Sequence, residues 1–231
     1  MTGTISLVPV TGLPEIAPGD DLAGMIAEAA DLADGDVVVV TQKIVSKAED
    51  RVVDIDPAVG HKPLVETESV RVLRRRGDLV ISETEHGFVC ANAGIDLSNV
   101  PEGRAALLPV DPDRSARRIR DALRHRLGVD VAVIVSDTFG RPWRAGVTDV
   151  AIGCAGLRPV VDLRGTTDAL GRELQVTEVA VVDELAAAAE LVMGKASGVP
   201  VAVIRGVDPS WFGDGSVVAD VVRSPEDDLF R

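Results

Sequence analysis

The chain has 231 residues and a formal net charge of −13, and 46% of its residues are hydrophobic. This length and apolar content suit one large domain or two small ones with a substantial core, and they argue against a disordered chain. The acidic balance argues against a general nucleic-acid binder, and no apolar run is long enough to span a bilayer.

The first half of the chain is predicted to mix short strands with helices. A strand is expected at 5–10, and a loop and helix follow within 12–33, with Asp20 or Asp21 as the helix N-cap. A buried strand at 36–40 then changes into polar residues. A helix is expected within 60–77, and strands at 78–84 and 87–96 are expected around a turn at His86 and Gly87.

The second half carries the strongest local signals. Residues 111–128 predict an amphipathic helix with an Asp or Ser start, a terminal Gly128 and an apolar ladder at Ala116, Ile119, Leu123 and Leu127. A strand at 129–138 is apolar on both faces, as in parallel sheets. A strand pair at 148–163, a strand or helix leading into an alanine-rich helix within 173–198, and a buried strand at 199–206 complete the chain.

This order predicts a mixed α/β (α+β) fold. The sequence shows no internal repeat, low-complexity linker or obvious boundary, so we expect a single domain over 1–231. The acidic tail at 224–231 is either a docking segment or the start of a linker.

Common nucleotide, metal and redox motifs are absent from the sequence. It has no Walker-type phosphate loop, no Rossmann fingerprint, no C-x-x-C and no H-E-x-x-H. His61, His86 and His125 are scattered, which favours surface or turn positions over catalysis. Cys90 and Cys154 lie among small apolar residues and are expected to be free, buried thiols. Together with the lack of a secretory-signal pattern, they predict a cytoplasmic protein.

Polar residues in two stretches suit anion or cation binding. Lys43 and Lys47 lie four apart just beyond the strand at 36–40, where two ammonium groups on one helical face suit phosphate. A solvated helix start is the alternative. Asp96 and Asn99 lie in a Gly- and Pro-bounded loop, and their oxygens are of the kind that bind hard cations. An Asx-turn is the alternative there.

The stretch SDTFGRPWRAG, residues 136–146, directly follows the apolar run VAVIV, and we expect a loop there. Because ligands gather at the carboxyl ends of strands in open α/β sheets, Asp137 and Thr138 are candidate metal ligands. Arg141 and Arg144 can grip phosphate or carboxylate oxygens. A capped helix start with surface arginines is the alternative.

Two further loops are weaker candidates. Residues 193–200 place one lysine between two glycines, and a helix C-cap explains those glycines equally well. The charged loop at 162–173 carries Asp162, Arg164, Asp168, Gly171 and Glu173, with no role beyond substrate or dimer contacts.

Taken together, these stretches resemble the coenzyme F420-0:L-glutamate ligase family, also called F420 γ-glutamyl ligases. The matching segments run over nearly the whole chain, and the SDTFGRPWR block followed by DLRG, GREL and DELA is specific. They are LVPVTGLPEI, VVVVTQKIVSKAE, GIDLSNVPEG, LLPVDPDRSARRIR, VIVSDTFGRPWRAGVTDVAIGCAGL, DLRGTTDALGRELQVTEVAVVDELAAAAELVMGKASGVPVAVIRG and the terminal DLFR.

The resemblance implies an F420 ligase-type fold in an intertwined homodimer. It implies GTP as the energy source, Mg²⁺ or Mn²⁺ with two ions per site, and a monovalent cation such as K⁺. The implied metal ligands are Asp96 and Asp137, with Thr138 serving the second ion. The implied GTP-binding residues are Leu13, Pro14, Glu15, Ile16, Gln42, Lys47, Asn99, Met193, Gly194, Lys195, Ala196, Ser197, Gly198, Val199 and Pro200.

One position departs from the pattern. Some relatives carry an amide side chain where this chain has Lys195. A lysine cannot ligate a metal while it is charged. The second metal site is therefore expected to be incomplete, or completed by backbone carbonyl and water.

The implied reaction begins when a carboxylate of F420-0 attacks the γ-phosphate of GTP, which gives an acyl phosphate and GDP. The amine of L-glutamate then attacks the acyl carbon and releases phosphate, and a second cycle can add a further glutamate. Asp137, Arg141 and Arg144 are expected to be catalytic, with the arginines holding the acceptor carboxylate or the transition-state charge.

Two other classes of function stay open at this point. One is a metal-dependent nucleotide hydrolase, and the other is a non-catalytic GTP-binding subunit of a flavin enzyme. In some bacteria the same domain is fused to a nitroreductase-like flavin module. The chain is therefore either a free-standing ligase or the N-terminal half of such a fusion.

Overall fold

The computed structural model describes residues 3–229, so the last two residues of the acidic tail lie outside the described residues. The α-helices are α1 Leu22–Ala29, α2 Gln42–Ala48, α3 Lys62–Thr67, α4 Pro112–Leu127, α5 Val181–Met193 and α6 Val217–Asp220, and short 3₁₀ helices are η1 Asn92–Gly94 and η2 Pro209–Trp211. The strands are β1 Ser6–Val10, β2 Val37–Thr41, β3 Val52–Asp54, β4 Arg71–Arg76, β5 Leu79–Glu83, β6 Val89–Ala91, β7 Arg104–Ala106, β8 Ala132–Arg141, β9 Arg144–Ala155, β10 Val161–Asp162, β11 Glu178–Val179 and β12 Val201–Arg205.

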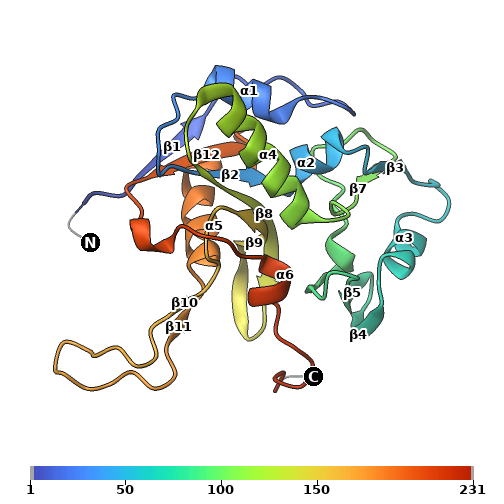
Figure 1. The fold of residues 1–231 in the computed structure, drawn as a ribbon. Coiled ribbons are helices and arrows are strands. Elements are labelled where there is room, and N and C mark those ends of the chain that lie inside the picture. The colour runs from blue at the N-terminus through green and yellow to red at the C-terminus, as the bar shows by residue number, and fades with distance from the viewer. Residues whose placement is uncertain (1–2, 230–231) are drawn as a thin grey trace.

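A five-stranded sheet in the order β1-β12-β2-β8-β9 forms the centre of the fold. β2 and β8 are parallel, and the other neighbours are antiparallel. Figure 1 shows α4 on the near side of this sheet with α5 behind it, and α1 beside α4. Smaller sheets β4-β5-β6, β3-β7 and β10-β11 surround it, so the predicted mixed α/β class is confirmed.

The central strands are those with the plainest apolar runs. The valines of β2 and residues Ala132–Ser136 of β8 are fully buried, as expected for parallel strands covered on both faces. The predicted helix at 111–128 is α4. Asp111 caps its start by accepting from the Arg114 N–H at 2.8 Å, and Gly128 ends it at φ 70°. The apolar ladder stops at Leu123, because Leu127 is 41% exposed.

Three predicted elements differ in the structure. The helix expected within 60–77 covers only α3, and residues 71–76 form β4, because they pair with β5 across a turn at Gly77 with φ 60°. The strand expected at 87–96 is shorter, because Asn92 and Ala93 have positive φ and begin η1. Residues 136–146 are not a loop, since β8 and β9 continue as a hairpin to Arg141 and Arg144.

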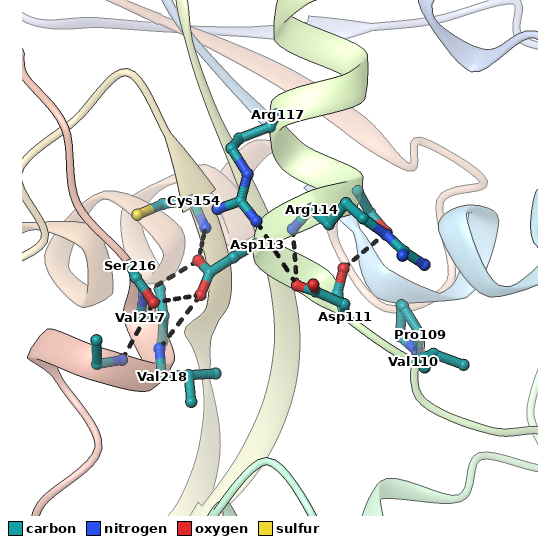
Figure 2. A network of polar contacts seen from close by, with 12 residues as sticks. Pro109, Val110, Asp111, Asp113, Arg114, Arg117, Cys154, Ser216, Val217 and Val218 are labelled. Atoms are coloured by element: carbon teal, nitrogen blue, oxygen red, sulfur yellow. Dashed lines mark hydrogen bonds and ion pairs between the residues drawn. The ribbon is translucent and has the colours of Figure 1, made fainter.

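The amino end of α4 is fixed to both β9 and the C-terminal segment. A Cβ on Gly153 of β9 would lie 2.3 Å from the Pro112 carbonyl carbon, so only glycine permits this approach. The buried Asp113 carboxylate accepts from the Cys154 N–H at 2.8 Å, the Ser216 hydroxyl at 2.6 Å and the Val217 N–H at 3.0 Å (Figure 2). Within residues 3–229, no helix has the length and apolar content needed to cross a membrane.

Candidate functional site

A cleft of about 310 Å³ opens at the carboxyl ends of β2 and β8. The two strands are parallel and in register up to Thr41 and Ser136, so the polar residues that follow each strand emerge side by side. This is the edge where ligands of open α/β sheets bind. The cleft is lined by Leu13, Pro14, Glu15, Ile16, Thr41, Gln42, Lys43, Ile44, Lys47, Asp96, Asn99, Ser136, Asp137, Thr138, Asp149, Glu190, Gly194, Lys195, Ala196, Gly198, Val199 and Pro200.

The cleft therefore gathers most of the residues that the sequence singled out. Both candidate carboxylates, Asp96 and Asp137, line it, and so do the segment 13–16 and most of the loop after α5. Met193 and Ser197 do not line it. Met193 is 1% exposed and packs in the core. The Ser197 hydroxyl donates to the backbone carbonyl oxygen of Met193.

Arg141 and Arg144 also lie outside the cleft of their own chain. They stand opposite each other at the tip of the β8–β9 hairpin and are exposed, and the Arg141 guanidinium donates to the Ala145 carbonyl at 3.1 Å. The structure therefore does not bring these arginines to the candidate metal ligands within one chain.

Asp137 is the acid of the cleft whose pKa is shifted most. Burial raises its pKa to about 7, and the nearby charges of Asp96 and Asp149 act in the same direction. The backbone N–H of Thr138 and the charge of Lys195 oppose this rise. A carboxylate in this position gains strongly from a cation that would hold it in its charged form.

Asp149 is a residue of the cleft that the sequence analysis missed. It is 2% exposed and accepts from the Ser136 hydroxyl at 3.0 Å and the Thr138 hydroxyl at 2.6 Å. These contacts follow from the cross-strand pairing of Thr138 with Asp149 in the hairpin. Because residues 136–146 were expected to be a loop, no local pattern indicated this pairing.

Asp96 comes from a different part of the chain, just after η1. Its backbone pairs with Ala106, which fixes the loop against β7. The Lys43 ammonium contacts its carboxylate at 2.7 Å, and the Ser98 N–H donates to it at 2.7 Å. Burial alone would raise the pKa of Asp96, but the hydrogen bonds from Lys43 and Ser98 outweigh burial and hold that pKa below its ordinary value.

Two residues of α2 present donors to the cleft. Lys47 is 8% exposed and pairs with Glu15, whose side chain is largely exposed. Gln42 is 1% exposed, and its carbonyl oxygen accepts from the Ser46 hydroxyl at 2.9 Å. Its Nε2 is the one buried side-chain nitrogen or oxygen without a partner among residues 3–229. A buried orphan donor in a cleft is a position that a ligand acceptor can satisfy.

The donor set of the cleft fits one hard divalent cation. Within the described part of the chain, no group of three or more His, Cys, Asp and Glu side chains is placed to hold a metal ion alone. Mg²⁺ is commonly held by one or two carboxylates, with water and substrate phosphates as the remaining ligands. Asp96 and Asp137 match that pattern.

Known proteins match nearly the whole length of the chain. The family model described as F420-0:Gamma-glutamyl ligase matches residues 12–206. A coenzyme F420:L-glutamate ligase of Methanothermobacter thermautotrophicus is 47% identical, with 98% of this chain and 99% of the relative covered. One of Methanopyrus kandleri is 44% identical, with 99% and 98% covered. The resemblance found in the sequence is confirmed, and the chain belongs to the F420-0:gamma-glutamyl ligase family.

Proposed function

We propose that this chain is a ligase that joins L-glutamate to coenzyme F420-0 at the expense of GTP, through an acyl-phosphate intermediate. The family and its near full-length relatives support glutamate ligation to F420. The observation that carries the mechanism is the cleft, where two acids from separate parts of the chain meet a buried lysine and an unpartnered amide.

The first step joins two anions. An oxygen of the F420-0 carboxylate attacks the γ-phosphorus of GTP, the bond to the β,γ-bridging oxygen breaks, and GDP leaves with that electron pair. Phosphoryl transfer of this kind depends on positioning and charge neutralisation rather than on a protein nucleophile. The scattered histidines and the two buried free cysteines are consistent with that requirement.

The second step forms the amide. The glutamate nitrogen attacks the acyl carbon, the carbon–oxygen bond to the phosphoryl group breaks, inorganic phosphate leaves, and the nitrogen loses a proton. A second round on the γ-carboxylate of the added glutamate would extend the chain.

The residues of the cleft divide between the metal ion and GTP. Asp96 and Asp137 would hold Mg²⁺ or Mn²⁺, which would neutralise phosphate charge when bound. Lys47 would exchange its contact with exposed Glu15 for a nucleotide phosphate, and the Gln42 amide would donate to the nucleotide. The loop at 194–200 and the segment 13–16 would enclose the rest of GTP.

The remaining expectations stay predictions. We propose a homodimer, which is supported by the projecting β8–β9 hairpin and its exposed Trp143 and Val147. We also propose catalytic roles for Arg141 and Arg144, a requirement for a monovalent cation such as K⁺, and a cytoplasmic location.

The fate of one oxygen atom tests the acyl phosphate. F420-0 labelled with ¹⁸O in its reacting carboxylate should transfer one labelled oxygen to inorganic phosphate for each amide formed. Unlabelled phosphate released together with product would exclude the intermediate. GTP consumption that does not depend on glutamate and F420-0 would instead indicate a nucleotide hydrolase.

A further inference from the structure

The position expected for a second cation, beside Thr138, carries a lysine. The Lys195 ammonium donates to the Thr138 hydroxyl oxygen, and the Thr138 hydroxyl donates its own proton to Asp149 at 2.6 Å. A divalent cation bound to the same oxygen would lie next to the ammonium and be repelled by it. A charged lysine also offers no lone pair with which to ligate the cation. The residues at this position therefore do not fit a second metal ion.

Acidic side chains of the cleft surround the Lys195 ammonium, which supplies a positive charge among them. Glu190, Asp149 and Asp137 all line the cleft with Lys195. Burial raises the pKa of Glu190, the Asp149 charge adds to the rise, and Lys195 opposes it. The Thr138 hydroxyl joins Lys195 to Asp149, because it accepts from the ammonium and donates to that carboxylate.

The local backbone holds this lysine in place. α5 is capped by Gly194, which has a φ of 63°. The Gly194 N–H donates to the Glu190 carbonyl at 2.9 Å. The Ser197 hydroxyl bonds to the Met193 carbonyl and closes the turn. Lys195 therefore projects from a helix C-terminus, where the helix dipole favours a positive charge. Its side chain is exposed and lines the cleft.

We propose that the Lys195 ammonium takes the place of a second divalent cation, so that each site binds one divalent cation, at Asp96 and Asp137. The ammonium would then supply the second positive charge to the nucleotide phosphates. This inference rests on the proposed function, because it concerns the charge that phosphoryl transfer needs.

The number of bound metal ions tests it directly. Metal-free protein is titrated with Mn²⁺ in the presence of a β,γ-imido GTP analogue, and free Mn²⁺ is counted by electron paramagnetic resonance. The wild-type chain should bind one Mn²⁺ per chain. Lys195→Gln and Lys195→Glu should bind two, and the second ion should broaden the signal of the first. Lys62→Gln, at an exposed lysine paired with Asp78, should behave as wild type.

Each outcome separates this inference from the proposed function. Two ions on the wild-type chain would overturn the inference and leave the ligase proposal intact. No Mn²⁺ on any of the proteins would overturn both. One ion on both Lys195 variants, with circular dichroism showing native folds, would mean that the lysine does not exclude a second ion. Should both variants misfold, the wild-type count decides alone.

Discussion

Replacing Asp137 with asparagine should stabilise the metal-free protein while abolishing turnover. Burial raises the pKa of this acid from 3.8 to about 7. Between these values the folded chain keeps a proton that the unfolded chain releases, so wild-type stability falls as pH rises through this window. Each pKa unit corresponds to about 1.4 kcal/mol, so the full penalty above pH 7 approaches about 4 kcal/mol as an upper limit.

Asparagine carries no proton to lose, so its advantage should grow with pH. The variant's free energy of unfolding, relative to that of wild type, should therefore rise by about 2.5 kcal/mol between pH 5 and pH 8. This value follows from linkage with the two pKa values. Urea unfolding in the presence of EDTA at the two pH values measures it. Adding Mn²⁺ should then stabilise wild type and not Asp137→Asn, by about 2.7 kcal/mol at a hundred times the dissociation constant.

A second variant separates the effect of burying the Asp137 carboxylate from the effect of changing the net charge of the chain. Glu28→Gln removes one negative charge from an exposed position of α1, outside the cleft, in a chain of net charge −13. Its pH response shows what loss of one charge does by itself. If Asp137→Asn gains no more between pH 5 and pH 8 than this control does, the electrostatic account of Asp137 is wrong.

Three further substitutions test the packing and the nucleotide site. In the same urea assay, Gly153→Ala should lower the free energy of unfolding by about 3 kcal/mol or more, because its Cβ would meet the Pro112 backbone. Gly140→Ala is the control: its Cβ would meet nothing within 4 Å, and the free energy of unfolding should change by less than about 0.5 kcal/mol. Asp113→Ala should cost about 3 kcal/mol, because four donors lose their acceptor, and a loss below about 1 kcal/mol would contradict the role of this network. Gln42→Leu should weaken binding of a fluorescent GTP analogue about tenfold without lowering stability, and unchanged affinity would remove Gln42 from the site.

The parts of the fold that could be predicted from sequence are those with local causes. β2 and the first residues of β8 are continuous apolar runs, and α4 carries its own cap at Asp111 and its own stop at Gly128. β4 was missed because its arginines, together with Glu66 and Glu68 just before them, also suit a solvated helix. Pairing with β5 decides its conformation. Such pairing lies outside any local window of the sequence.

The site divides in the same way. Asp96 and Asp137 could be proposed from residue type and position, and the cleft brings both together. Asp149 could not, because its contact with Thr138 depends on the register of the β8–β9 hairpin. The contact between Lys195 and Thr138 likewise depends on how the end of α5 packs beside β8.

Mass spectrometry of the deazaflavin product tests the central claim most directly. The purified chain is incubated with F420-0, L-glutamate, GTP and Mn²⁺, and the deazaflavin is followed over time. The account predicts mass gains in steps of one glutamyl residue that vanish without GTP, together with one GDP for each step. GDP without any glutamyl product, or bound GTP with no turnover at all, would contradict it.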